Sequence, residues 1–324
     1  LTDTVLADFD SSATDIKLPF TGVETFYANI NSANTAGDEQ YNFDITDATG
    51  LSTIAVTSSA NNNQLLDIDE YDSSVTVQLG VAAGKGGSAA IAGFNNSSSV
   101  DINLAAPAGS GDIVNMKLVD TDDASGTIDI DAAGTEILNI AVSTDAESHK
   151  LDLAGVTASS GSASVVLTGG VGTDGVEITA TSDAMKLDGS AYLGTMTVSG
   201  KHASAAEHTG TGQIDSLFMN HHSDVLDGGA GADTLIISYI QNMGVGMIDL
   251  TSTTDQVSVL NGAGNGSAQK GFVSVDLSAV TTNGFNVTGT SGANTITGSA
   301  AADTINGGDG DDTIRGHGGG DTIN

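Results

Sequence analysis

Apolar and polar residues alternate in short runs along the first half of the chain. Residues 100–104 read Val-Asp-Ile-Asn-Leu and residues 127–131 read Thr-Ile-Asp-Ile-Asp, so both runs repeat with a period of two. This period is typical of a β-strand that buries one face. Gly, Asn, Ser and Asp, which favour turns, separate the runs, and no helical period is sustained. The pattern predicts an all-β fold, in which residues 1–159 form an irregular β-rich region of the solenoid or sandwich kind.

A second period, of nine residues, emerges after residue 160. Residues 169–177 read Gly-Gly-Val-Gly-Thr-Asp-Gly-Val-Glu, which matches the nonapeptide pattern Gly-Gly-x-Gly-x-Asp-x-U-x, where U is a large apolar residue. The period continues through residues 178–186, returns three times in residues 210–236, and fills residues 289–324 with four consecutive copies. The sixth positions of these copies are held by Asp174, Asp183, Asp215, Asp224, Asp233, Asn294, Asp303, Asp312 and Asp321.

The positions of these copies divide the chain into four predicted regions. Residues 1–159 are the β-rich region, and residues 160–236 are nonapeptide coils interrupted by an insertion. Residues 237–288 form a connecting β segment that leads to residues 289–324, a parallel β-roll of stacked nonapeptide coils. The chain begins at Leu1 rather than Met and ends in mid-repeat, so we expect that both ends of the protein, including the rest of the β-roll, extend beyond it.

The nine-residue spacing predicts calcium sites between stacked turns. Each copy divides into a turn and a short strand, and two copies make one coil of 18 residues, so Asp303 stacks over Asp321 and Asn294 over Asp312. Stacked strands lie roughly 4.8 Å apart and calcium–oxygen bonds are roughly 2.3–2.6 Å long, so one ion fits between two turns. Turn carbonyls complete the oxygen ligands that calcium prefers, and Mg²⁺ is a poor substitute. We therefore expect several Ca²⁺ ions.

Glycine at positions one, two and four supplies the backbone conformations that such a tight turn needs. The candidate metal-site residues are therefore the sixth-position residues and the glycines of the best-matched turns, Gly169, Gly170, Gly172, Gly228, Gly229, Gly231, Gly307, Gly308, Gly310, Gly316, Gly318 and Gly319. The alternative is that each aspartate only caps its own turn. Three turns depart from the pattern: Asn294 lacks a charge, residues 298–302 keep only the first glycine, and residues 219–223 have none.

The charge balance gives a second reason to expect cations. Eight Lys and Arg face 41 Asp and Glu, for a formal net charge of −33. Such a chain repels nucleic acid and anionic membranes, and its carboxylates repel one another. Either cations neutralise these carboxylates or they form a solvated surface like that of a halophile protein. The sequence has no Cys and no apolar run long enough to span a membrane, so we expect neither disulfides nor a membrane span.

Other polar clusters have two interpretations each. Two acidic clusters are either further calcium sites or solvated loops, namely Asp120 with Asp122 and Asp123, and Asp67 with Asp69, Glu70 and Asp72. The adjacent residues His221 and His222 are either a transition-metal site or surface residues. The sequence contains no His-Glu-x-x-His motif and no Gly-x-Ser-x-Gly elbow between a strand and a helix, so it predicts no enzyme.

The nonapeptide copies resemble the RTX repeats of proteins that Gram-negative bacteria export by type I secretion. The Val- and Thr-rich strands, and residues 275–280 (Val-Asp-Leu-Ser-Ala-Val) leading into residues 289–294, are similar to the calcium-binding surface-layer (S-layer) proteins of Caulobacter-like bacteria. This second resemblance implies an extracellular structural protein whose partners are copies of itself in a two-dimensional lattice. In that family, a further segment outside this sequence anchors the protein to lipopolysaccharide. The alternatives are an RTX adhesin or biofilm matrix protein, and a calcium-dependent folding module of a secreted exoenzyme.

Overall fold

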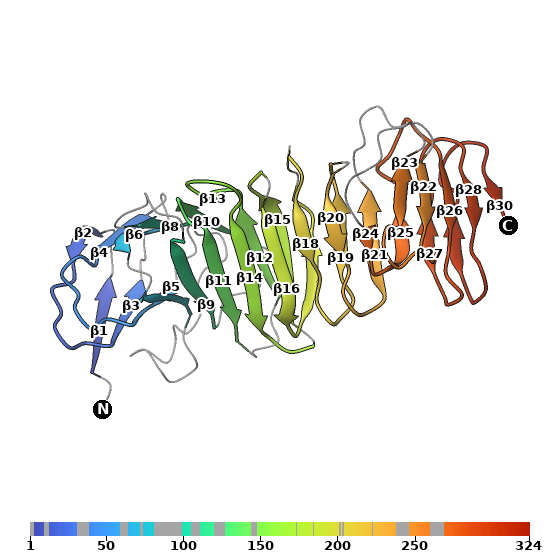
Figure 1. Ribbon diagram of the computed structural model, residues 1–324. Coiled ribbons are helices and arrows are strands. Elements are labelled where there is room, and N and C mark those ends of the chain that lie inside the picture. Colours follow the sequence, from blue (N-terminus) through green and yellow to red (C-terminus); the bar gives the residue numbers. More distant parts are fainter. Residues whose placement is uncertain are drawn as a thin grey trace. The chain divides into compact units, whose positions relative to one another are not determined.

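The structure is a computed structural model made of β-strands joined by turns (Figure 1). It describes residues 3–9, 13–30, 39–58, 64–71, 74–80, 99–104, 111–119, 127–143, 148–172, 174–183, 185–200, 202, 204–221, 223–237, 246–259 and 269–324. These residues form no helix, so no described segment is a helix that could cross a membrane. Their strands stack in parallel sheets, which confirms the predicted all-β fold with a parallel β-roll.

The chain folds into two units, one comprising Leu1–Met185 with Ala191–Gly194 and the other Lys186–Ser190 with Thr195–Asn324. In the first unit, successive strands alternate between two sheets, so a pair of strands makes one coil. One sheet contains β1 (Thr4–Phe9), β3 (Thr25–Ile30), β5 (Thr53–Ser58), β7 (Thr76–Leu79), β9 (Ile113–Leu118), β11 (Ile137–Val142) and β14 (Ser164–Gly169). The other contains β2 (Ala13–Lys17), β4 (Glu39–Asp44), β6 (Gln64–Tyr71), β8 (Ser99–Leu104), β10 (Ile128–Ala133), β12 (Ser148–Leu153) and β15 (Gly175–Thr181), and β13 (Val156–Thr157) pairs with β10.

The second unit is also built of coils, and most of its strands are shorter. One set is β16 (Lys186–Tyr192), β18 (Glu207–Thr209), β20 (Val225–Asp227) and β24 (Gln269–Lys270). The second set is β17 (Thr195–Val198), β19 (Ser216–Met219), β21 (Asp233–Ile237), β25 (Phe272–Asp276), β27 (Thr295–Thr297) and β29 (Thr313–Arg315). The third is β23 (Val257–Val259), β22 (Gly246–Asp249), β26 (Phe285–Thr288), β28 (Thr304–Asn306) and β30 (Thr322–Ile323), in which β22 and β23 pair antiparallel.

The core of the first unit is apolar and contains a group of aromatic rings. Alternate residues of β11 are buried, and Leu138 stacks in register on Val114 of β9. The Phe43 ring packs edge-on against those of Phe9 and Phe26, with centroids 5.5 and 5.7 Å away. Side chains of this size fill coils wider than a nonapeptide pair can form.

Stacked polar side chains also join successive coils of the first unit. The Asn29 amide donates to Asp8 Oδ1 at 2.8 Å, 21 residues earlier, and its oxygen accepts the Thr57 hydroxyl at 2.7 Å, 28 residues later. Asn139 donates to Asn115 Oδ1 at 2.9 Å, across 24 residues. The coil length thus varies from coil to coil, because loops of different length separate similar strands.

The coils of the second unit keep the predicted 18-residue repeat. Ile305 of β28 pairs in register with Ile323 of β30, and Ile296 of β27 pairs with Ile314 of β29. The Asp303 N–H donates to Asp321 Oδ1 across 18 residues, as the stacking of their turns requires. Eighth-position side chains point inward, and most are fully buried, as in Leu217, Leu226, Leu235, Ile296 and Ile305.

Candidate calcium turns

Six of the predicted turns lie over one another in three stacked pairs. The pairs are residues 210–215 with 228–233, 289–294 with 307–312, and 298–303 with 316–321. In each pair, the sixth residue of the first turn donates its N–H to Oδ1 of the sixth residue of the second turn, 18 residues later. These bonds run from Asp215 to Asp233 at 2.8 Å, from Asn294 to Asp312 at 2.9 Å, and from Asp303 to Asp321 at 3.0 Å.

The first turn of each pair has Ser or Thr at position two, and its sixth side chain caps its own turn. Asp215 accepts the N–H of Thr211 at 2.6 Å and the Thr211 hydroxyl at 3.0 Å. Asp303 accepts the N–H of Ser299 at 2.7 Å and its hydroxyl at 3.0 Å. Asn294 accepts the Thr290 N–H at 2.8 Å through Oδ1. Asp215, Asn294 and Asp303 therefore each cap their own turn, as the alternative interpretation of the sequence expected.

The second turn of each pair leaves its aspartate less occupied. Its positions two and four have positive φ, as in Gly308 (91°) and Gly310 (110°), and also in Gly229, Gly231 and Gly319. In the last turn His317 replaces the glycine at position two and keeps a φ of 70°. Asp233, Asp312 and Asp321 each accept a hydrogen bond from the stacked turn through Oδ1.

Among these aspartates, Asp233 has the surroundings that least favour its charged form. It is fully buried, and within the described part of the chain its Oδ2 has no hydrogen-bond partner. Burial raises the pKa of Asp233 to about 7, and the charges of Asp215 and Asp227 add to that rise, against the hydrogen bond from the Asp215 N–H. A buried anion with an unsatisfied oxygen needs a cation or a proton.

The glycines allow the stacked turns to approach closely beside these carboxylates. A Cβ on Gly228, Gly307 or Gly316, at position one, would lie against Oδ2 of the aspartate in the same turn. A Cβ on Gly229 or Gly308, at position two, would collide with a backbone carbonyl of the stacked turn. Glycine is therefore needed at these positions for carboxylate and carbonyl oxygens to lie this close to the backbone.

These oxygens suit calcium, which takes carboxylate and carbonyl ligands together. In the described residues, no three His, Asp or Glu side chains lie close enough to hold a metal ion alone. An ion in the stacked pairs would therefore need the backbone. Asp233, Asp312 and Asp321, with carbonyls such as those of Thr211 and Thr290, would hold it.

The two earlier candidates, Asp174 and Asp183, lie in different surroundings. Asp174 is buried and accepts the Val171 N–H at 2.6 Å, and Gly169 and Gly170 of its turn have positive φ, whereas Gly172 and Asp183 are exposed. The turn of Asp174 lies against Tyr192 and Gly194 rather than against another nonapeptide turn. The structure thus does not bring Asp174 and Asp183 into a stacked pair like the three above.

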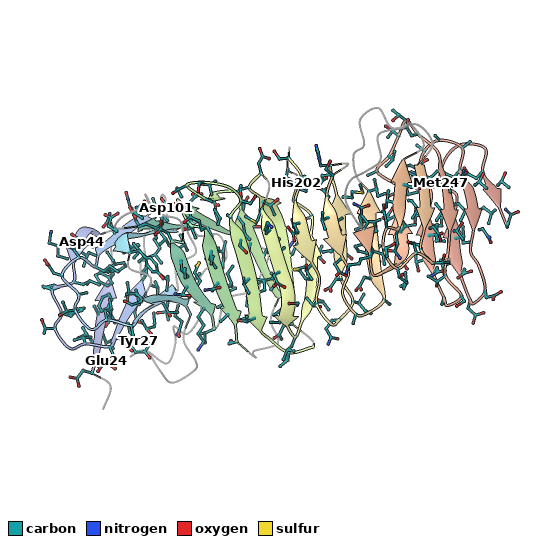
Figure 2. All side chains as sticks on the ribbon, in the orientation of Figure 1. Glu24, Tyr27, Asp44, Asp101, His202 and Met247 are labelled. Atoms are coloured by element: carbon teal, nitrogen blue, oxygen red, sulfur yellow. The ribbon has the colours of Figure 1, made fainter. Side chains whose placement is uncertain are left out.

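Asp224 is surrounded by donors that the sequence did not suggest. Its Oδ1 lies 2.9 Å from Nε2 of His202, and both side chains are fully buried. Figure 2 labels His202, which belongs to the second unit. Counting nonapeptides back from residue 210 places His202 at position two and His208 at the apolar position eight, which is the signal that would have found them.

Among the other acidic residues, a row of carboxylates follows one sheet of the first unit. Amides of Asn42 and Asn103 donate to both Asp67 and Asp69. Burial raises the pKa of Asp101 to about 6, and the neighbouring Asp131 charge contributes to the shift. The residues Asp72, Asp120, Asp122, Asp123 and His222 and the side chain of Glu70 lie outside the described residues.

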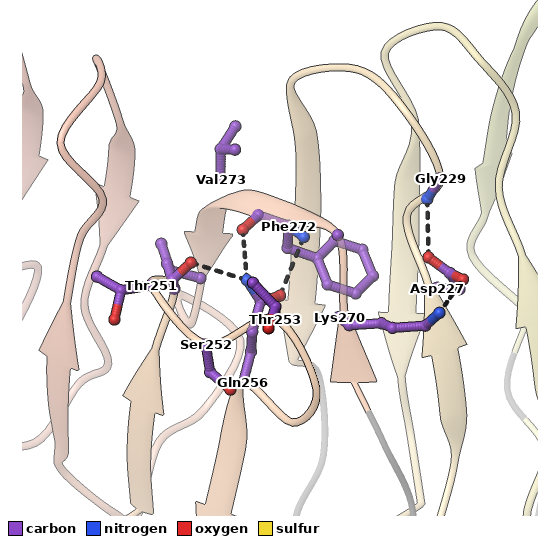
Figure 3. Close-up of a pocket in the computed structure, with 11 residues that line it drawn as sticks. Asp227, Gly229, Thr251, Ser252, Thr253, Gln256, Lys270, Phe272 and Val273 are labelled. Atoms are coloured by element: carbon purple, nitrogen blue, oxygen red, sulfur yellow. Dashed lines mark hydrogen bonds and ion pairs between the residues drawn. The ribbon is translucent and has the colours of Figure 1, made fainter.

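A hollow of ≈ 380 Å³ in the second unit is lined by both polar and apolar side chains (Figure 3). Its lining includes the hydroxyl residues Thr251, Ser252 and Thr253, and Lys270, whose Nζ lies 2.8 Å from Asp227 Oδ2. Gln256 donates to the Leu250 and Phe272 carbonyls at 2.9 and 2.8 Å, so its amide ties the walls together.

Comparison with protein families identifies the stacked pairs. The model of the RTX calcium-binding nonapeptide repeat matches residues 210–236 and 288–323, in four copies. This chain carries RTX calcium-binding repeats. All three stacked pairs lie in the matched residues, so the RTX repeats bind several Ca²⁺ ions, whereas Asp174 and Asp183 lie outside the match.

The RTX repeats also indicate a secreted, extracellular protein, and the match indicates no catalytic family. No curated protein and no solved structure matches the chain.

Proposed function

We propose that this protein is a structural, non-catalytic surface-layer protein, which calcium folds and assembles into a two-dimensional lattice on the outer surface of a bacterium. The observation that supports it best is Asp233, a buried carboxylate with an open oxygen in a chain of net charge −33. A structure of this kind needs cations for its stability.

Calcium would act first on folding. In the stacked pairs, second-turn carboxylates lie one coil from the sixth residue of the first turn, and the glycine-rich turns bury few apolar side chains. Without cations the charges repel and the turns lose their order. Type I secretion fits this behaviour, because a chain in a low-calcium cytosol would stay unfolded until it is exported.

Calcium would act second on assembly. The acidic faces of two copies repel one another, and the row that includes the half-buried Asp67 and Asp101 and the exposed Asp129 places several carboxylates on one sheet. Calcium screens such faces and bridges carboxylates of neighbouring copies. Extracellular calcium modules bind at about 10⁻⁴–10⁻³ M, so millimolar calcium lies in the range that would switch assembly on.

The test is light scattering and electron microscopy of the full chain with and without millimolar calcium. We expect scattering to rise steeply with calcium, and microscopy to show ordered sheets that a chelator disperses. A protein that folds in calcium but remains monomeric at high concentration would contradict the lattice. It would favour an RTX adhesin, a biofilm matrix protein or a folding module of an exoenzyme.

A further inference from the structure

Asp224 and Asp233 hold equivalent positions in the RTX coils. The Ala206 N–H donates to Asp224 Oδ1 at 3.0 Å, across 18 residues. The Asp215 N–H donates to Asp233 Oδ1 at 2.8 Å across the same separation. Both carboxylates are fully buried, so any difference between them comes from their other neighbours.

Those neighbours differ in number and kind. Whereas Asp233 accepts the one bond from Asp215, Asp224 has three further donors. The N–H groups of Asn220 and His221 reach Oδ2 at 3.0 and 2.8 Å, and His202 Nε2 lies 2.9 Å from Oδ1. Since an ionised carboxylate only accepts hydrogen bonds, Nε2 of His202 carries the hydrogen.

The pKa shifts of the two aspartates differ as their hydrogen-bond partners would predict. Burial on its own would raise the pKa of Asp224, but the His202 hydrogen bond and charge and the backbone N–H groups of Ala206 and His221 lower it below its ordinary value. Asp233 has a raised pKa. Asp224 therefore keeps its charge in the buried site without a metal ion, because donors already surround it.

A second histidine fills the adjacent interior. His208 pairs in register with Leu226, and its ring lies edge-on to that of His202 with centroids 5.8 Å apart. Burial lowers the pKa of His208 to about 4, so its ring is neutral at pH 7. The ring thus behaves as an apolar core side chain, which leaves His202 as the partner of the carboxylate.

We infer that the His202 imidazole closes the stacked pair of turns ending at Ala206 and Asp224 in place of calcium. Asp224 then holds no ion, although its repeat lies within the family match. His202 stands at position two of the first turn of its pair, where the ion-binding pairs have Thr211, Thr290 or Ser299, and Ala206 supplies no side-chain oxygen at position six. The inference rests on the calcium role of the other RTX turns, and it does not depend on lattice formation.

The test counts the calcium ions bound to the full chain, by equilibrium dialysis with metal analysis, in matched variants. Asp233→Asn should lose one ion per chain, whereas Asp224→Asn should keep the wild-type number. His202→Gln, which removes the imidazole but keeps a side-chain N–H donor, should also keep it, and circular dichroism in saturating calcium checks that each variant is folded. Loss of one ion in Asp224→Asn or His202→Gln would overturn the inference.

The reverse exchange gives a gain rather than a loss. His202→Thr combined with Ala206→Asp gives this first turn the residues that Thr211 and Asp215 hold in an ion-binding pair, so the count should rise by one ion; an unchanged count in the folded variant would overturn the inference. One zinc ion bound by the wild type and lost in both His202→Gln and His208→Gln would overturn it too, because the imidazoles would then be metal ligands. A wild-type calcium count of zero would contradict the calcium role of the RTX turns instead.

Discussion

Strand β11 of the first unit has six residues and buries three of them, Leu138, Ile140 and Val142, whereas β28 in the RTX repeats has three residues and buries Ile305 alone. Each large apolar side chain contributes about 1.5–3 kcal/mol when it is fully buried. A coil of the first unit thus has several times the apolar contribution of an RTX coil. The RTX coil must obtain its stability in the turns, where the carboxylates and carbonyls lie.

The polar contacts between coils differ in the same way. In the first unit, neutral amides such as Asn29 separate stacked polar groups, and a hydrogen-bonded column of this kind needs no ion. In the RTX repeats, Asp233 lies one coil from Asp215, and both are buried. The two units therefore show that parallel strands can stack either as a wide apolar coil or as a narrow charged one, and we expect the narrow charged coil to depend more strongly on a metal ion.

Removing calcium should produce the largest difference between the two units. In the full chain, amides of β27 and β28 should exchange at least about a hundredfold faster in chelator than in saturating calcium, since an ion at about 100 times its Kd contributes about 2.7 kcal/mol. Amides of β3 and β11 should change little. Hydrogen exchange with mass spectrometry measures both together, and equal loss of protection in the two units would contradict the comparison.

Removing a buried aromatic ring should destabilise the first unit, and unlike the effect of removing calcium on the RTX repeats, this loss should not depend on calcium. Phe43→Ala removes a fully buried ring that packs against Phe9 and Phe26, so unfolding of this unit should become easier by about 3–5 kcal/mol. The loss should be the same in calcium and in chelator, as urea denaturation can show. Leu6→Ala is the matched control, because Leu6 in β1 is 43% exposed and should cost little.

A single methyl group should discriminate between two glycines of the RTX turns. Gly308→Ala combines a φ of +91° with a clash against the Thr290 carbonyl, so it should destabilise the calcium-bound protein by about 2 kcal/mol. Gly320→Ala meets no atom within 4 Å and no unusual φ, and should be nearly neutral. Urea unfolding in saturating calcium compares them, and equal effects would contradict the stacked geometry.

The smallest expected effect concerns the acidic row of the first unit. Burial, and after it the Asp131 charge, raise the pKa of Asp101 from 3.8 to about 6, so its ionisation increasingly opposes folding between these two pH values and fully opposes it above about 6. Asp101→Asn should therefore stabilise the protein by about 0.5–1 kcal/mol at pH 7, after allowance for solvent screening, and have little effect near pH 4. Thermal unfolding at both pH values measures this.

Asp44→Asn should change the stability of the protein in the opposite direction to Asp101→Asn. Hydrogen bonds from Thr46 and Lys17 lower the pKa of Asp44 to about 2, so its charge stabilises the fold at pH 7 and stops doing so only as the pH falls through that value. This variant should destabilise at pH 7. If Asp101→Asn destabilised the protein in calcium but not in chelator, the acidic row would be a calcium site.

The sequence predicted the RTX coils well because their spacing is invariant. Aspartate and isoleucine recur at fixed positions from residue 289 onward, so the stacking of Asp303 on Asp321 follows from counting alone. Counting could not give the two kinds of turn. That difference depends on whether position two carries a hydroxyl, as Ser299 does, or permits a positive φ, as Gly308 does.

The first unit and the Asp224 turn were harder to predict for a physical reason. Contacts between coils of the first unit join residues 21, 25, 28 or 24 positions apart, so no single period marks the coil, although each strand is visible. Asp224 has the same sequence position as Asp233. Its different role comes from His202 and Ala206, which reach it across 22 and 18 residues through the fold.

The turns of the RTX repeats lie alternately on two edges, and partners are two nonapeptides apart. The edge on which a turn lies therefore depends on whether an even or an odd number of nonapeptides precedes it. Removing 18 residues would shorten it by one coil and leave every remaining turn on its own edge. Removing residues 307–315 alone would transfer the turn of Asp321 to the other edge, where it would meet Asn294 instead of Asp303. Such a protein can gain or lose a whole coil without changing how its turns pair. Gaining or losing a single nonapeptide, which is half a coil, gives every turn beyond that point a different partner.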